Sequence, residues 1–190
     1  MTTDTHARAV GVGVSSIVEA LQKIAPLNLA ASWDNVGLLV EPTQRETVHK
    51  ILLTNDLTEA VVDEAVSLGG VGFIVSYHPP IFAPLKRLTA STFKERVILK
   101  VIEAKIAVYS PHTALDTVGG GVNDWLATGV GEGRVEPMSF SEVDPGRIVS
   151  STVKGFANKE SAEAFCRKVK ECVELDSTTE VWVLVLKHVL

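Results

Sequence analysis

Residues 50–80 read KILLTNDLTEAVVDEAVSLGGVGFIVSYHPP, and the architecture can be inferred from this stretch outward. The runs at 50–54 and 71–76 are almost continuously apolar, which is typical of strands buried on both faces of a sheet. Between them, Thr58 can cap the start of an amphipathic helix and the glycine pair after residue 68 can end it. The order strand, helix, strand predicts two neighbouring parallel strands joined by a crossover helix.

The same alternation continues on both sides of this stretch. Ser16 and Glu19 form an S-x-x-E capping box that predicts the start of one helix, and Thr92 and Glu95 form another. The apolar run at 106–109 predicts a further strand after the second of these helices. We therefore predict an α/β fold with a mostly parallel sheet flanked by helices.

Composition changes along the chain and divides it into four segments. Residues 1–14 are predicted to be a flexible N-terminus and residues 15–130 to form the α/β domain. Residues 131–149 are rich in Gly, Pro and acidic residues and are predicted to be a linker. Residues 150–190 are interpreted as the start of a second α/β unit or of an insert. The β-prone run at 181–186 has no closing turn after it, so we interpret the chain as lacking a C-terminal part.

Charge and cysteine content limit the classes of partner and compartment. The 190 residues include 18 Lys and Arg and 23 Asp and Glu, a formal net charge of −5, which gives no basic surface for direct nucleic-acid binding. No apolar run is long enough to span a membrane. Cys166 and Cys172 are expected to be reduced thiols. We expect a cytoplasmic protein, with the nucleus open to it and mitochondria less favoured.

Polar side chains follow two of the predicted strands. Tyr77 and His78 end the strand at 71–76, and His112 and Asp116 follow the strand at 106–109. Ligand sites of parallel α/β folds gather at the carboxyl ends of strands. Imidazole and carboxylate are a partial ligand set for zinc, iron or manganese. The alternative is that each histidine is a hydrogen-bonded structural residue.

Basic residues gather around the start of the helix near residue 93. They are Lys86, Arg87, Lys94 and Arg96. This group is interpreted as a solvated face, with a phosphate-contacting patch as the alternative.

Five motifs together resemble the Nif-three-like family, also called GTP cyclohydrolase I type 2 homologues. They are SWDNVGLLV at 32–40, TNDLT at 54–58, SYHPPIF at 76–82, SPHTALD at 110–116 and GVNDWLA at 121–127. Their wording is similar to that of the animal branch, and the resemblance covers about residues 16 to 130.

The resemblance implies a homo-oligomeric ring with a dinuclear metal site that faces an internal cavity. By position, His78 matches the second residue of the family's His-His pair and Asp116 matches its aspartate, so these are the expected metal ligands. His112 would line the site. Tyr77 stands where many members have the first histidine, and the family's C-terminal His and Glu have no counterpart, since His188 lies in an apolar run. We therefore expect a divalent-metal site that lacks part of its ligand set.

Three functions remain open at this point. The resemblance to the animal branch favours a regulatory protein that binds transcriptional co-regulators through protein contacts. The alternative is a metal-dependent hydrolase of a nucleotide-like small molecule, with His112 as the catalytic proton shuttle. The third is a short form without a function of its own.

Overall fold

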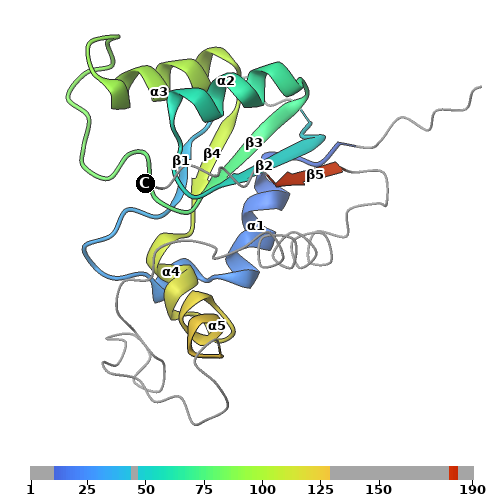
Figure 1. The fold of residues 1–190 in the computed structure, drawn as a ribbon, viewed down its shortest axis with the longest axis vertical. Helices are drawn as coiled ribbons and strands as arrows, with labels where there is room; N and C mark the ends of the chain where they lie inside the picture. Colours follow the sequence, from blue (N-terminus) through green and yellow to red (C-terminus); the bar gives the residue numbers. More distant parts are fainter. Residues whose placement is uncertain (1–10, 44–46, 129–179, 184–190) are drawn as a thin grey trace, which may run out of the picture.

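The computed structural model describes residues 11–43, 47–128 and 180–183. Helices and strands alternate along most of this part of the chain (Figure 1). In chain order the elements are α1 (Val14–Ile24), the 3-10 helix η1 (Leu27–Leu29), β1 (Gly37–Val40), β2 (Lys50–Thr54), α2 (Glu59–Leu68), β3 (Val71–Ser76), α3 (Phe93–Glu103), β4 (Ala107–Ser110), α4 (His112–Thr117), α5 (Val122–Thr128) and β5 (Glu180–Val183).

The strands form one five-stranded sheet in the order β1-β4-β3-β2-β5. β4, β3, β2 and β5 are parallel to one another, and only β1 runs antiparallel, against β4. The predicted mostly parallel α/β fold is confirmed. The pairing of Ile51 with Phe73 and of Phe73 with Ala107 places the predicted βαβ unit at the centre of the sheet.

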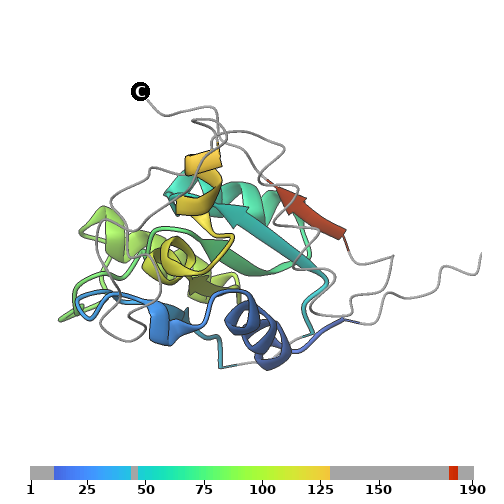
Figure 2. The ribbon, with the colours of Figure 1, turned by 90° about the horizontal axis from the view of Figure 1, so that it is seen from below.

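Helices cover the two faces of the sheet with two separate apolar cores. On one face, Leu52, Ile74 and Val108 pack against residues of α2 and α3. On the other face, Phe73 and Tyr109 pack with residues of α1. Figures 1 and 2 show α1 on the opposite side of the sheet from α2 and α3. Each central strand is thus buried on both faces, which explains why its sequence is apolar throughout.

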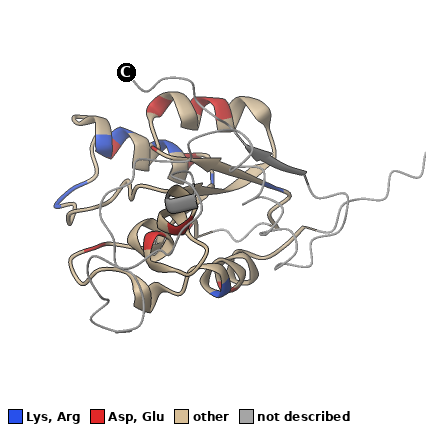
Figure 3. Ribbon diagram, turned by 60° about the horizontal axis from the view of Figure 1, so that its bottom comes forward, with Lys and Arg blue, Asp and Glu red and all other residues tan. Residues whose placement is uncertain are grey.

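Ion pairs join the two helices that share a face. Arg96 Nη2 of α3 lies 2.9 Å from Glu59 Oε1 of α2, and Lys100 Nζ lies 2.6 Å from Asp63 Oδ1. Figure 3 shows acidic positions on α2 beside basic positions on α3. Arg96 of the predicted basic group therefore pairs with an acidic residue.

Two of the predicted helix caps are observed and one is not. The Thr58 and Thr92 side chains accept hydrogen bonds from the backbone N–H groups of Val61 and Glu95. The predicted capping box at Ser16 is wrong, because α1 begins at Val14 after Gly13, with no side-chain cap. Val14 packs against the second core, so burial extends this helix beyond its local start signal.

Part of the sequence interpretation falls outside the described residues. The predicted linker, both cysteines and His188 lie there. Within the described part, Val12 forms a bridge with Val48, and β5 pairs with β2 in the main sheet. Among the helices of this part, none is long and apolar enough to cross a membrane.

Candidate functional site

Two loops meet at the carboxyl edge of the sheet. Tyr77 and His78 follow β3, and His112 and Asp116 lie one helical turn apart on α4, directly after β4. α4 lies beyond the carboxyl end of β4 (Figure 1). Because β3 and β4 are parallel neighbours, the residues that follow them share one edge. The structure brings all four side chains together.

Three rings form a compact cluster there. The ring centroids of His78 and His112 are 5.5 Å apart, and those of Tyr77 and His112 are 5.6 Å apart. Tyr77 and His78 are closer still, at 4.8 Å, in an edge-to-face arrangement. The cluster therefore presents two imidazoles and one phenol to a single small region.

The carboxylate of Asp34 holds His112 and its helix in place. Asp34 Oδ1 lies 2.8 Å from His112 Nδ1, and Asp34 Oδ2 accepts hydrogen bonds from the backbone N–H and the side-chain hydroxyl of Thr113. The Asp34 side chain is 0% exposed. Although burial by itself raises the pKa of Asp34, the hydrogen bonds from His112 and Thr113 outweigh it and hold the pKa below its usual value. Asp34 is thus a buried, ionised acceptor.

The backbone at His112 is unusual for a non-glycine residue. Its φ angle is +30°, in the left-handed region, which costs on the order of 1–3 kcal/mol. Strain of this kind persists only where the surroundings fix it. The bonds from Asp34 to both His112 and Thr113 supply that restraint, since they hold the first turn of α4 from the side of β1.

His78 is oriented by a second carboxylate. Asp56 lies in the loop that follows β2, and its Oδ1 atom lies 2.8 Å from His78 Nδ1. The side chains of His78 and Asp56 are 39% and 63% exposed, so this pair is open to water. In both histidines a carboxylate engages Nδ1, which leaves Nε2 as the ring atom available for another contact.

Tyr77 and Asp116 form a buried pair beside the histidines. The Tyr77 hydroxyl donates a hydrogen bond to Asp116 Oδ1. Burial, together with this hydrogen bond to Asp116, raises the pKa of Tyr77 far above its usual value, so the phenol stays protonated. Burial also raises the pKa of Asp116, although the bond from Tyr77 and the nearby His112 oppose it. Tyr77 therefore acts as a hydrogen-bond donor to Asp116, rather than as a phenolate.

Buried serines fix the backbone from which the cluster projects. Ser110 Oγ donates to the carbonyl of Tyr77 at 2.8 Å, and Ser76 Oγ donates to the carbonyl of His78 at 2.7 Å. Both serines are fully buried, and each satisfies a carbonyl that the sheet leaves unpaired. The cluster is thus built on a rigid strand edge.

An aromatic surface adjoins His112. Trp33 is 65% exposed and its ring centroid lies 6.3 Å from that of His112. Phe82 is 47% exposed, and its ring centroid lies 6.2 Å from that of Trp33. Exposed aromatic rings beside a polar cluster suit contact with a planar or apolar group.

Imidazole and carboxylate are suitable ligand types for a divalent cation, but the described residues supply too few of them. Metal-binding histidines commonly donate their second ring N–H to a carboxylate, as the Nδ1 atoms of His78 and His112 can do here. However, within residues 11–43, 47–128 and 180–183, no group of three or more His, Cys, Asp or Glu side chains is placed to hold a metal ion. A cation would need donors beyond His78 and Asp116, such as water or further protein groups.

The sequence interpretation missed the two orienting carboxylates. Asp56 lies in the TNDLT motif and follows β2, whose carboxyl end adjoins that of β3. Asp34 precedes β1, and because β1 is antiparallel to β4, its amino end lies at the same edge. The position of Asp56 after an apolar strand was a usable signal. The position of Asp34 was not, since it depends on the direction of β1.

Comparisons with known proteins agree over most of the chain. The family model Duf34/NIF3 (NGG1p interacting factor 3) matches residues 12–185. NIF3-like protein 1 of Mus musculus is 50% identical over 125 residues, which are 66% of this chain and 33% of the mouse protein. NIF3-like protein 1 of Drosophila melanogaster is 50% identical over 128 residues, 67% of this chain and 44% of the fly protein. NGG1-interacting factor 3 of Saccharomyces cerevisiae is 38% identical over 137 residues, 67% of this chain and 47% of the yeast protein.

Solved structures show the same fold. A Bacillus cereus protein related to NIF3 matches with a TM-score of 0.64 and 34% identity, over 70% of this chain and 36% of that one. Reduced HcgD from Methanocaldococcus jannaschii matches with a TM-score of 0.63 and 27% identity, over 86% of this chain and 61% of that one. The chain spans about a third of the length of the mouse protein and less than half of the length of the fly and yeast proteins.

Proposed function

Because this chain belongs to the Duf34/NIF3 family, we propose that its carboxyl sheet edge is a divalent-cation site. The observation that carries the proposal is the pair of carboxylate–imidazole contacts, Asp56 to His78 and Asp34 to His112, which leave both Nε2 atoms available. Orientation of this kind is what ligating histidines require.

Each residue has a distinct role in this proposal. His78 supplies Nε2 and Asp116 supplies a carboxylate oxygen as ligands, and zinc, iron or manganese suits that set. Tyr77 holds Asp116 by its hydrogen bond and stays protonated. His112 lies beside both and would take up or release a proton.

Metal-dependent hydrolysis of a nucleotide-like small molecule is the reaction class that this site would serve. A bound divalent cation supplies Lewis acidity and a water of lowered pKa. His112 would move a proton at Nε2, while Asp34 keeps its ring in one orientation. Trp33, whose ring lies near that of His112, and its neighbour Phe82 would contact a planar substrate ring.

Calorimetric titration of the chelator-stripped full chain with Zn²⁺ or Mn²⁺ tests the proposal. We expect saturable binding that is weakened at least tenfold by His78→Ala. His49→Ala is the matched control, because His49 is exposed and its described contact is with Thr47, away from this edge. Equal metal affinities of the two variants would show that His78 is not a ligand of a cation site and would contradict the proposed function.

A protein-contact role in transcription is the second candidate, and the name of the yeast relative favours it. That protein is called NGG1-interacting factor 3 and is 38% identical over the aligned part. We propose that this chain, as a homo-oligomer in the cytoplasm or nucleus, binds a transcriptional co-regulator without contacting nucleic acid. A purified co-regulator should bind it at physiological salt after nuclease treatment, and loss of binding on nuclease treatment would contradict the proposal.

A further inference from the structure

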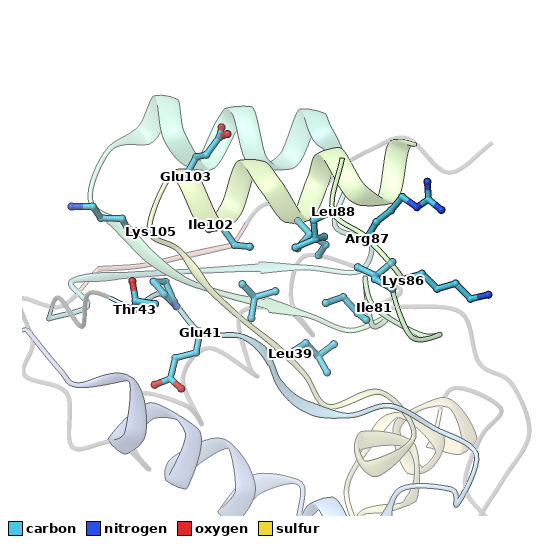
Figure 4. A pocket seen from close by; sticks show the side chains of 14 residues that line it. Leu39, Glu41, Thr43, Ile81, Lys86, Arg87, Leu88, Ile102, Glu103 and Lys105 are labelled. Atoms are coloured by element: carbon cyan, nitrogen blue, oxygen red, sulfur yellow. The ribbon is translucent and has the colours of Figure 1, made fainter. Parts of the chain in front are cut away.

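A groove lies between the edge strand β1 and helix α3, apart from the histidine cluster. Its volume is about 720 Å³, and apolar side chains form its middle (Figure 4). They come from β1, from the loop after β3 and from α3, and are Leu39, Ile81, Leu85, Leu88, Ile98 and Ile102. Tyr77, His78, His112 and Asp116 do not line it.

The apolar residues of the groove are more exposed than a core would leave them. Leu85, Leu88 and Ile102 are 37%, 45% and 41% exposed, although each is large and hydrophobic. Scattered exposed leucines need no explanation, but these three line one concave surface. Burying them against another molecule would be favourable, because it removes apolar surface from water.

The strand beside the groove has an edge that no other described strand pairs with. Within residues 11–43, 47–128 and 180–183, β1 is the last strand of the sheet on that side, with β4 as its neighbour. Leu39 and Val40 at the end of β1 line the groove, together with Glu41, Pro42 and Thr43, which follow the strand. The end of β1 and the segment after it therefore form one wall of the groove. An open strand edge beside a helix is where other proteins add a peptide as an extra strand.

The charges at the two ends of the groove differ. Figure 4 shows Lys86 and Arg87 at one end and Glu41, Glu103 and Lys105 at the other. Lys86 and Arg87 are exposed and form no ion pair within the described part of the chain, unlike Arg96, which pairs with Glu59. In a chain of net charge −5, this places two available cations beside an apolar groove. Acidic groups are the complementary partner.

We propose that the groove binds an extended peptide segment of a partner protein, which pairs with the edge of β1. The segment would place apolar side chains against Leu85, Leu88 and Ile102 and an acidic side chain beside Lys86 and Arg87. The proposal deepens the second candidate function, on which it rests, by giving the partner contact a location and a chemistry. It is independent of the cation site.

Selection from a displayed random-peptide library on the immobilised full chain tests the proposal. We expect the enriched peptides to combine alternating apolar residues with Asp or Glu. Fluorescence anisotropy of a labelled enriched peptide should show at least tenfold weaker binding to the double variant Lys86→Glu/Arg87→Glu and to Ile102→Glu. Lys23→Glu, a single Lys-to-Glu exchange on α1 across the sheet, should bind as the unmodified chain does.

Several outcomes would overturn the proposal. The first is a library that yields no enriched peptides, which is expected if another part of this chain fills the groove. The second is enrichment of basic peptides. The third is peptide binding that the groove variants do not weaken. A change of oligomeric state in Lys86→Glu/Arg87→Glu, measured by sedimentation, would assign the groove to contact between copies instead. A co-regulator that binds the groove variants normally would leave the second candidate function standing and remove only the groove. His78→Ala should bind the peptide as the unmodified chain does, because His78 does not line the groove. This result separates the test of the groove from the test of the cation site.

Discussion

Asp34 Oδ1 lies 2.8 Å from His112 Nδ1, across 78 positions of sequence. The contact joins the segment that enters β1 to the first turn of α4. It fixes the ring of His112 and, through Thr113, the backbone that carries Asp116. The arrangement of the candidate site therefore depends on a carboxylate side chain that is itself buried.

Asp34→Asn should lower the free energy of unfolding by about 2–4 kcal/mol. The amide keeps one acceptor but loses the charge that strengthens three hydrogen bonds, and its NH₂ group faces donors in a buried position. Urea unfolding of the full chain measures the change. Asp63→Asn is the matched control, since Asp63 is 63% exposed and pairs only with Lys100 among the described contacts. Equal unfolding midpoints for the two variants would contradict the assigned role.

The cost of Asp34→Asn should depend on pH in one direction. The pKa of Asp34 is lower in the folded chain than in the unfolded chain, where it is about 3.9. Its ionised form therefore contributes stability that is fully present above the unfolded pKa and is lost as pH falls through the folded pKa. The difference in unfolding free energy between the parent chain and Asp34→Asn should shrink below about pH 4. A difference in unfolding free energy that grows as the pH falls would contradict a lowered pKa of Asp34 in the folded chain.

Tyr77→Phe should raise the pKa of Asp116 further in metal-free protein. The Tyr77 hydroxyl donates to Asp116 and so favours its ionised form, against the effect of burial. Carboxyl-carbon NMR, followed through a pH titration, measures this pKa. Tyr109→Phe is the control, because the buried Tyr109 hydroxyl has no hydrogen-bond partner in the described structure. An Asp116 pKa that stays the same or falls in Tyr77→Phe would show that the hydroxyl does not act on this carboxylate.

Gly121→Ala should destabilise the end of the site by about 1–3 kcal/mol. A Cβ at residue 121 would lie 2.1 Å from the carbonyl oxygen of Leu115, so α4 and α5 would have to separate. That separation would strain the bond from Asn123 Nδ2 to the Asp116 carbonyl, which is now 2.8 Å. Thermal unfolding measures the effect, with Gly13→Ala as the control, since its Cβ would meet nothing nearer than 3.9 Å. Similar losses of thermal stability in both variants would mean that the close approach of residue 121 to the Leu115 carbonyl oxygen does not cause the loss.

The parts of the fold that were predictable are those whose local signals agree with their burial. The unit β2-α2-β3 has a threonine cap, a glycine stop at Gly69 and strands buried on both faces, so its pattern and its packing indicate the same structure. β1 has no comparable local signal. Its pairing with β4 is a contact between distant segments, and its direction follows from that pairing. The true start of α1 likewise depends on burial of Val14 rather than on the Ser16 signal.

The candidate site divides in the same way. That His78 and His112 lie together follows from the rule that parallel strands end at one edge, which requires only the strand pattern. That Asp34 and Asp56 take the Nδ1 atoms depends on side-chain geometry, which no spacing reveals. The metal ligand roles of His78 and Asp116 and the catalytic role of His112 stay predictions.

The metal content of the protein as purified tests the central claim most directly. The full chain would be prepared without chelators or a histidine tag, beside His78→Ala and His49→Ala, and metal per chain measured by plasma mass spectrometry. We expect near-stoichiometric zinc, iron or manganese in the parent chain and in His49→Ala, and its loss in His78→Ala. Folded protein that contains almost no metal, or equal metal in all three proteins, would contradict a cation site at this sheet edge.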